Sequence, residues 1–359
     1  MINVTKSYLP DFEEYSKVLK KAWEKSWLTN NGVLSQELES KISNYLGVNN
    51  TIYVNNGTIA LQLAIKTLDK NKDEIITTPF SYVATTNAIL WEGFKPIFCD
   101  INSKNYCIDE NKIENLITKK TSAILATHVF GNPCNIEKIE TIGKKYNLKI
   151  IYDGAHAFGT IYKENSLLSY GDISICSFHA TKIFHTVEGG CVITNSSEDF
   201  KKINLFKQFG HIGDKYLSIG INGKNSEFHA AMGLCNIDKI EEIIKERREI
   251  TKWYNYYLDK MNLKVLIPSP ESKYNFSYYP VEFLNENELL SVVKKLHSNN
   301  IFPRRYFYPS LNKLPFLEKS NSCTISEEIS KKILCLPLYN GMDEKLTYRI
   351  CKLINNCLK

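Results

Sequence analysis

The residues best suited to chemistry are an acid and a lysine, each placed where a buried strand ends. Asp153 closes the apolar run Ile150-Ile151-Tyr152, and Lys182 follows the run Ile173–Phe178 within the segment SFHATK. The carboxyl ends of strands in an open α/β sheet are where ligands bind. Apolar neighbours favour the uncharged, nucleophilic form of a lysine. Asp153 alone could merely cap a turn, but the pair indicates a site that combines a carboxylate with an activated amine.

A third feature, Asn56-Gly57-Thr58, precedes a helix and predicts an anion site. Backbone N–H groups and the helix dipole favour negative charge at a helix N-terminus, although Asn-Gly turns before helices are common. The hydroxyl of Ser177 could complete a phosphate cradle. A carboxylate at a strand end also suits pyridoxal 5'-phosphate (PLP), because a protonated ring nitrogen makes that cofactor an electron sink.

The pattern of elements around these residues predicts an α/β fold. Two amphipathic helices open the chain, and strands then alternate with helices, which argues for a sheet covered on both faces. The expected helices are Asp11–Lys25, Ser35–Tyr45, Ile59–Leu68, Val83–Trp91 and Ile136–Tyr146. The expected strands are Thr51–Val54, Glu74–Thr77, Lys95–Asp100, Ala123–His128, Lys149–Asp153, Ile173–Phe178 and Cys191–Asn195.

The C-terminal third is expected to form a smaller α/β domain. Ser226–Met261 has helical periodicity over its whole length and predicts one long linking helix. Ile267–Ser272 (IPSPES) suits a boundary, and we expect a large domain over residues 1–265 and a small one over 266–359. The small domain should contain a strand over Asn275–Phe283 and helices over Glu286–Ser298 and Asp343–Leu358.

Composition narrows the class of protein. The chain has 359 residues, a formal net charge of +6 and 23% charged residues, without a block of like charge, so a nucleic-acid partner is not expected. None of the ten cysteines forms a CxxC pair, and no metal site is predicted. No apolar run reaches the ~20 residues of a membrane span, and no signal-peptide core opens the chain. A cytoplasmic protein with reduced thiols and no membrane partner is expected.

The ordered set of motifs resembles the DegT/DnrJ/StrS family of sugar-nucleotide aminotransferases. The spacing of Asp153 and Lys182, the segment SFHATK and the downstream EGG carry the resemblance. Further matching segments are NNGTIAL (Asn55–Leu61), TTPFSYVATTNAI (Thr77–Ile89), THVFGNPC (Thr127–Cys134) and GINGKNSEFHAAMGL (Gly220–Leu234). The resemblance covers nearly the whole chain. It implies PLP-dependent fold type I, with a mostly parallel seven-stranded sheet in the large domain and a smaller C-terminal α/β domain.

The resemblance also assigns roles to individual residues. Lys182 would bind PLP covalently and shuttle the proton, and Asp153 would pair with the ring nitrogen. The other implied cofactor contacts are Gly57, Thr58 and Ser177 at the phosphate, Tyr82 stacked on the ring, His156 near the ring hydroxyl, and Asn222 at the phosphate site of a partner subunit. The implied assembly is a homodimer with active sites shared at the interface.

The implied reaction moves an amino group from L-glutamate, through the pyridoxamine form of the cofactor, to a keto-deoxysugar linked to a nucleotide. The stretches WLTNNG, FHATKIFHTVEGG and PRRYFYPSL most resemble the viosamine-forming branch, which converts dTDP-4-keto-6-deoxyglucose to dTDP-4-amino-4,6-dideoxyglucose. Candidate substrate contacts are Asn30, His185, Arg304, Arg305 and Tyr308. His185 could equally be a hydrogen-bonded structural histidine.

Three alternatives remain open at this point. Amination at C3, or of a UDP- or GDP-linked sugar, would use the same fold. A non-catalytic sugar-nucleotide-binding protein of this fold would need no reactive lysine. A Rossmann-type oxidoreductase would share the α/β alternation, but no GxGxxG follows any strand candidate.

Overall fold

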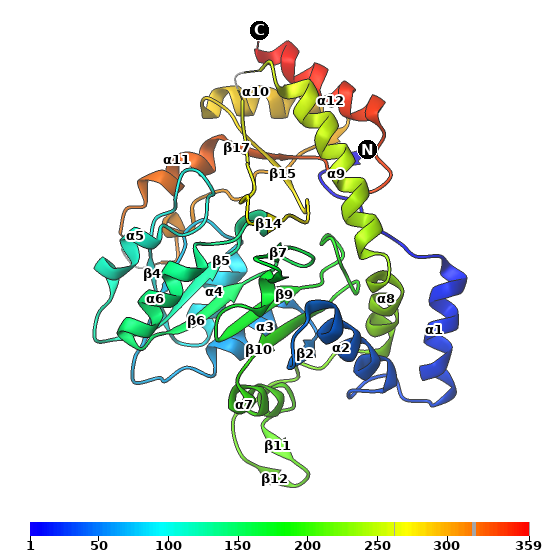
Figure 1. Ribbon diagram of the computed structural model, residues 1–359, viewed down its shortest axis with the longest axis vertical. Coiled ribbons are helices and arrows are strands. Elements are labelled where there is room, and N and C mark those ends of the chain that lie inside the picture. Colours follow the sequence, from blue (N-terminus) through cyan, green and yellow to red (C-terminus); the bar gives the residue numbers. More distant parts are fainter. Residues whose placement is uncertain (262, 318–320, 359) are drawn as a thin grey trace.

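A computed structural model describes residues 1–261, 263–317 and 321–358. Its centre is a seven-stranded sheet with the strand order β2-β10-β9-β6-β5-β3-β4 (Figure 1). Only β10 runs antiparallel to its neighbours, so the sheet is mostly parallel, as the sequence predicts. The strands are β2 (Thr51–Val54), β3 (Glu74–Thr77), β4 (Lys95–Phe98), β5 (Thr121–Thr127), β6 (Lys149–Asp153), β9 (Ile173–Ser177) and β10 (Gly190–Thr194).

Helices bury both faces of this sheet because its strands alternate their apolar side chains between two clusters. Ile151 packs with residues of α3 (Gly57–Ile65), α4 (Val83–Trp91) and α7 (Ser197–Lys207). Its neighbours Ile150 and Tyr152 pack on the other face, with residues of α2 (Val33–Leu46), α6 (Ile136–Tyr146) and α8 (Glu227–Ile237). The helix α1 (Phe12–Glu24) lies against α8 and α2. A parallel sheet covered in this way places its carboxyl-end edge at a ligand site.

The single long helix predicted over Ser226–Met261 is wrong. The structure has two helices, α8, which ends at Ile237, and α9 (Ile240–Leu258). Asn236 and Asp238 at the break are poor helix formers, and the Asn236 side chain donates to the backbone oxygen of His185 at 3.0 Å. Periodicity alone missed the break because the apolar pattern continues through it. The helix α9 then leads to the C-terminal part of the chain (Figure 1).

The C-terminal part contains a three-stranded antiparallel sheet of β13 (Lys264–Val265), β15 (Tyr279–Glu282) and β17 (Ile333–Leu336). Its core includes residues of α9, α10 (Glu286–His297) and α12 (Glu344–Leu358). The N-terminal strand β1 (Ile2–Asn3) joins this region by pairing with β16 (Ile301–Phe302). The helix α11 (Thr324–Lys332) precedes β17. The division at residues 265 and 266 stays a prediction.

The strand expected over Asn275–Phe283 is shorter in the structure. Only Tyr279–Glu282 pairs within the sheet, and residues 274–278 form a loop that returns to the large sheet. Asn275 fixes this loop by donating to the backbone oxygens of His156 and Phe158, both at 2.8 Å. Tertiary hydrogen bonds therefore replace the expected strand pairing, and they bring the C-terminal part against the end of β6.

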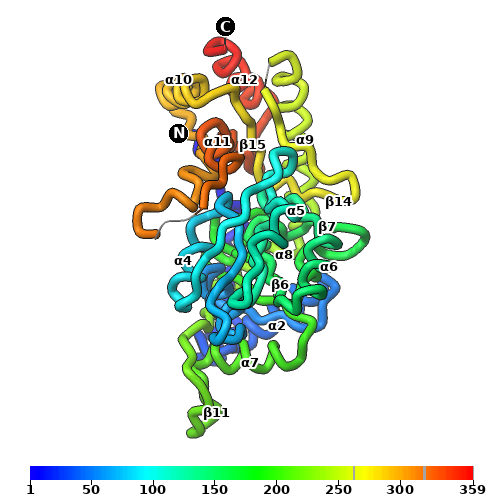
Figure 2. Tube along the Cα trace, turned by 90° about the vertical axis from the view of Figure 1, so that its left-hand side faces the viewer, coloured from blue at the N-terminus to red at the C-terminus, as the bar shows by residue number. Residues whose placement is uncertain are grey.

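Several short elements complete the fold. The helix α5 (Glu110–Ile113) precedes β5, and β14 (Ser272–Lys273), β7 (Ile161–Tyr162) and β8 (Asn165–Ser166) form a small sheet. The hairpin of β11 (His211–Ile212) and β12 (Lys215–Tyr216) projects from the end of the molecule opposite to α10 and α12 (Figure 2). Ile212 and Tyr216 on this hairpin are 69% and 81% exposed.

Candidate active site

A cavity of about 230 Å³ lies at the carboxyl-end edge of the large sheet. The strand ends contribute Thr127, Asp153 and Ser177, and α3 contributes its first residues. The C-terminal part closes the cavity with the residues Arg304, Tyr306 and Phe307. The acid, the lysine and the helix start that the sequence singled out therefore share one cavity.

Asp153 is the last residue of β6 and is 4% exposed. Its Oδ2 accepts a hydrogen bond from Thr85 Oγ1 at 2.6 Å, and its Oδ1 accepts one from the backbone N–H of Ala155 at 3.1 Å. Burial raises the pKa of this carboxyl group, whereas the two hydrogen bonds and the nearby Lys182 lower it. A cation placed in the cavity would offset the cost of burying the carboxylate.

Lys182 lies in the loop after β9, and its Nζ lies 3.3 Å from the hydroxyl of Tyr278. Burial lowers the pKa of this amine below its ordinary value, although the negative charge of Asp153 opposes the shift. Desolvation favours the neutral amine, which is the nucleophilic form. Tyr278 comes from the loop of the C-terminal part, so the position of the lysine depends on contacts between segments far apart in sequence.

The start of α3 packs closely against the end of β9. The Asn56 side chain caps the helix by accepting from the backbone N–H of Ile59 at 2.8 Å. A Cβ added to Gly57 would lie 2.8 Å from Ser177 Cβ, and one added to Gly190 would lie 2.8 Å from the Asn56 carbonyl carbon. Glycine at both positions thus permits a small cradle of N–H and hydroxyl groups. Such a cradle at a helix N-terminus suits a phosphate.

Aromatic groups border the same cavity. His156 lies with its ring centroid 4.6 Å from that of Tyr278, and its Nδ1 accepts from the backbone N–H of Phe130 at 3.2 Å. Burial lowers the pKa of His156, so the imidazole is neutral. Tyr82, at the N-cap position of α4, is half exposed and lines the cavity. A flat ring placed in the cavity would therefore meet two aromatic side chains.

This set of groups fits PLP. A buried carboxylate suits the ring nitrogen, a desolvated amine suits the aldehyde, and the cradle at α3 suits the phosphate.

Within the described residues no group of three or more His, Cys, Asp or Glu could hold a metal ion. No helix in the described part of the chain is long and apolar enough to cross a membrane.

The predicted substrate residues occupy different places. Arg304 lines the cavity, with its guanidinium carbon 4.5 Å from the centre of the Tyr306 ring. Arg305 instead pairs with Glu286 at 2.7 Å and lies over the ring of the half-exposed Tyr308 at 3.5 Å. Neither Arg305 nor Tyr308 lines the cavity, so the structure brings only one of the two arginines to it.

His185 is also placed outside the cavity. It is 1% exposed, and its Nε2 lies 2.6 Å from the backbone oxygen of Tyr8. Its Nδ1 accepts from the backbone N–H of Val187 at 3.3 Å. Both ring nitrogens are thus engaged within the chain, which is the arrangement of a structural histidine.

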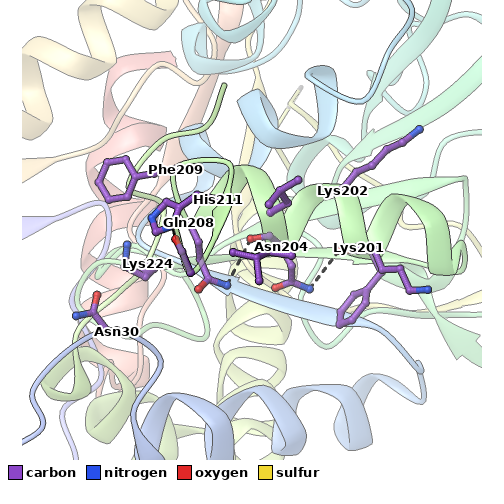
Figure 3. A pocket seen from close by; sticks show the side chains of 12 residues that line it. Asn30, Lys201, Lys202, Asn204, Gln208, Phe209, His211 and Lys224 are labelled. Atoms are coloured by element: carbon purple, nitrogen blue, oxygen red, sulfur yellow. Dashed lines mark hydrogen bonds between the residues drawn. The ribbon is translucent and has the colours of Figure 1, made fainter. Parts of the chain in front are cut away.

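Asn30 and Asn222 lie near a second, larger cavity of about 880 Å³ beside α7 and the hairpin (Figure 3). Asn30 and Lys224 line it, and the Asn222 Oδ1 accepts from Lys224 Nζ at 2.8 Å. Neither asparagine lines the cavity of Asp153 in its own chain. The backbone oxygen of Asn222 accepts from the Asn55 side chain at 3.3 Å, just before the start of α3. The role implied for Asn222 at the phosphate site of a partner subunit stays a prediction.

Sequence reasoning missed Thr85 and Tyr278, which contact Asp153 and Lys182. Thr85 follows Tyr82 by three positions at the start of α4, so helical spacing places both on one side of the helix. That spacing was an available signal. No sequence signal pointed to Tyr278, because its approach to Lys182 depends on the loop of residues 274–278. The cavity residues Glu188, Tyr306 and Phe307 lie in the segments FHATKIFHTVEGG and PRRYFYPSL, which the sequence associates with the substrate, but they were not singled out individually.

Known proteins similar to this chain in sequence and in structure are aminotransferases. A sequence model of the DegT/DnrJ/EryC1/StrS aminotransferase family matches residues 11–355. The structure of DesI with its TDP-sugar product superposes with a TM-score of 0.94 at 26% identity, covering 99% of this chain and 93% of that one. Helicobacter pylori PseC, an aminotransferase of pseudaminic acid biosynthesis, superposes with a TM-score of 0.91 at 26% identity, covering 98% and 99%. The fold is therefore that of the PLP-dependent aminotransferases of fold type I, as the sequence predicts.

The chain belongs to the DegT/DnrJ/EryC1/StrS aminotransferase family, and it is an aminotransferase. A dTDP-4-amino-4,6-dideoxy-D-glucose transaminase of Shigella dysenteriae is 42% identical over 348 residues, which cover 94% of each chain. The enzyme of the same name from Escherichia coli is 38% identical over 368 residues, which cover 98% of each. A GDP-perosamine synthase of Escherichia coli O157:H7 is 32% identical over 338 residues, covering 92% of each.

Proposed function

We propose that this enzyme transfers the amino group of L-glutamate to C4 of dTDP-4-keto-6-deoxyglucose, giving dTDP-4-amino-4,6-dideoxyglucose and 2-oxoglutarate. The observation that carries the proposal is the shared cavity of Asp153, Lys182 and the start of α3 in a chain 42% identical to a transaminase of that name. The lower identity to a GDP-perosamine synthase favours the dTDP-linked sugar over a GDP-linked one.

PLP is the proposed cofactor, and when bound it supplies an electron sink through its protonated ring nitrogen. Asp153 would accept a hydrogen bond from that nitrogen, and Gly57, Thr58 and Ser177 would hold the phosphate. Lys182 Nζ would hold the aldehyde end of the cofactor, and as a free amine it would accept and return the proton that moves during the transfer. Its lowered pKa suits this work, because the amine must be free to accept a proton. Tyr82 and the neutral His156 line the cavity, where Tyr82 would cover the ring and exclude water and His156 would meet the ring hydroxyl.

Arg304 is the better placed of the two arginines for the substrate diphosphate. It lines the cavity and is exposed, whereas the guanidinium of Arg305 is committed to Glu286. An arginine fork binds phosphate oxygens in pairs and so fixes the orientation of the nucleotide. That remote grip holds the keto carbon near the reacting nitrogen.

The active enzyme is a homodimer in which Asn222 of one subunit completes the phosphate site of the other. Support comes from the position of Asn222, which is exposed and does not line the cavity of its own chain. The neighbouring hairpin and loop expose apolar side chains, with Tyr216 at 81% and Ile219 at 78%. Large exposed apolar surface is typical of protein interfaces.

The ten free cysteines suit a reducing compartment such as the cytoplasm.

The function is tested with the purified protein, PLP, L-glutamate and two substrates in parallel, the 4-keto and the 3-keto isomers of dTDP-6-deoxyglucose. Mass spectrometry and NMR of the products should show amination of the 4-keto compound at C4. Amination of only the 3-keto compound would overturn the C4 assignment and leave the aminotransferase class intact. A colourless protein that binds the nucleotide sugar without turnover would identify a non-catalytic binding protein instead.

A further inference from the structure

Three hydroxyl groups form a hydrogen-bonded chain that ends on Asp153. Thr127 Oγ1 donates to Ser81 Oγ at 3.2 Å, the Ser81 and Thr85 hydroxyls lie 2.8 Å apart, and Thr85 Oγ1 donates to Asp153 Oδ2 at 2.6 Å. Since Thr85 Oγ1 donates its only proton to the carboxylate, the Ser81 hydroxyl must donate to Thr85. The three O–H dipoles therefore all point toward Asp153.

The chain is assembled from separate elements and is withdrawn from solvent. Thr127 ends β5, Ser81 lies in the turn after β3, and Thr85 lies in the first turn of α4. These three residues are between 0% and 3% exposed. Residues of a turn and of a strand end far apart in sequence are thus linked, through Thr85, to one oxygen of Asp153. Because the three hydroxyls are buried, water does not compete for these hydrogen bonds.

The charge on Asp153 depends on groups with opposite effects. Burial disfavours the carboxylate, whereas the hydrogen bond from Thr85 favours it. The Lys182 amine and the Cys176 thiol interact electrostatically with Asp153, and the imidazole of His156 lines the same cavity. Burial raises the pKa of Cys176 to about 12 and lowers that of His156, so both are neutral near pH 7. The groups that favour a negative Asp153 are the hydroxyl chain through Thr85, the backbone N–H of Ala155 and Lys182.

A proton shared between a carboxylate and a pyridine nitrogen has two possible positions. With the proton on nitrogen the pair is charged, and with the proton on oxygen it is neutral. A buried site without donors favours the neutral pair, because it lacks the solvation that charge requires. Aligned hydrogen bonds to the carboxylate stabilise the charged pair, and polarisation along the chain strengthens each bond.

We propose that the hydroxyls of Thr127, Ser81 and Thr85 form a relay of positioning residues that keeps the shared proton on the ring nitrogen of the cofactor rather than on Asp153. The inference rests on the proposed function, since it concerns PLP in the cavity described above. The relay acts through Asp153 and touches neither the substrate nor the reacting carbons. Its removal therefore weakens the electron sink without removing any group that binds the cofactor directly.

The test compares three variants of the holoenzyme. Thr85→Val keeps the shape of the side chain and removes its hydroxyl, whereas Thr85→Ser keeps the hydroxyl. Thr86→Val is the matched control, because Thr86 is the next residue of α4, equally buried, and its Oγ1 has no hydrogen-bond partner among the described residues. Each protein is loaded with PLP carrying ¹⁵N in the ring, and the ¹⁵N chemical shift reports whether that nitrogen is protonated.

Thr85→Val should move the ¹⁵N signal toward the value of an unprotonated ring, while Thr85→Ser and Thr86→Val keep the wild-type signal. The glutamate half-reaction of Thr85→Val should slow by at least about tenfold, a change of about 1.4 kcal/mol. An unchanged ¹⁵N signal in Thr85→Val would overturn the relay. If the wild-type protein itself binds no PLP, the proposed function fails, and the two failures are thereby distinguished.

Discussion

Replacement of Asp153 by asparagine separates the charge of this residue from its hydrogen bonds. The side chain of asparagine has nearly the same shape, and the surrounding donors fix its orientation. The backbone N–H of Ala155 requires an acceptor, so the amide oxygen should take the place of Oδ1. The amide nitrogen then faces the hydroxyl of Thr85, which can accept as well as donate. We therefore expect Asp153→Asn to fold and to retain its local structure.

The substitution Asp153→Asn should instead lower the rate of the reaction. Asp153 is 4% exposed, so its charge is little screened by water. Removing one partner of a buried ion pair costs roughly 3–5 kcal/mol, and each 1.36 kcal/mol is a factor of ten in rate. The glutamate half-reaction should then slow by roughly 160-fold to 5,000-fold, because the amide cannot keep a proton on the ring nitrogen.

The assay is a single-turnover stopped-flow measurement of the glutamate half-reaction, followed by the visible absorbance of the cofactor. Asp199→Asn is the matched control. Asp199 is also 4% exposed and pairs with Lys149 at 2.6 Å, but it lies in α7, outside the cavity. This control should lower the melting temperature and leave the half-reaction rate close to that of the wild-type enzyme. A near-normal rate for Asp153→Asn would refute the pairing of Asp153 with the ring nitrogen.

Three further predictions concern other groups of the site. Lys182→Ala should bind PLP without the visible absorbance of the covalent form and should lose turnover in the glutamate assay. Wild-type colour and rate in this variant would show that another amine binds PLP covalently and transfers the proton. Mixing Lys182→Ala with Asn222→Ala subunits should restore part of the activity, because each heterodimer has one intact site; heterodimers verified by mass spectrometry that stay inactive would place Asn222 in its own subunit. Tyr278→Phe removes an acceptor of the Lys182 amine at 3.3 Å, so it should lower kcat by about twofold to tenfold while burial keeps the pKa of that amine lowered; a kcat equal to that of the wild-type enzyme at every pH would exclude a role for Tyr278.

The core of the site could be predicted from sequence because its parts are local. Asp153 and Lys182 follow apolar runs, and the start of α3 follows a short strand, so each position depends only on where one strand ends. The order of such segments in an α/β fold then brings them to one edge of the sheet. The sheet was predictable for the same reason, since the strand Thr51–Val54 and the helices Val83–Trp91 and Ile136–Tyr146 have the expected bounds.

What could not be predicted depends on contacts between distant segments. Tyr278 reaches Lys182 only because Asn275 anchors its loop to the chain after β6. His185 is engaged by the backbone of Tyr8, a contact between positions more than a hundred residues apart. The break between α8 and α9 lies beside Asn236, whose side chain makes a tertiary hydrogen bond to the backbone of His185. Local periodicity does not encode these contacts, so they appear only with the folded chain.

The most direct test of the account is the position of the covalent link to the cofactor. The protein is incubated with PLP, reduced with borohydride, digested, and mapped by tandem mass spectrometry. The account predicts that the phosphopyridoxyl group is found on the peptide containing SFHATK, at Lys182, and that prior incubation with L-glutamate reduces the labelling. A label on any other lysine, or no label on a folded protein saturated with PLP, would contradict the account.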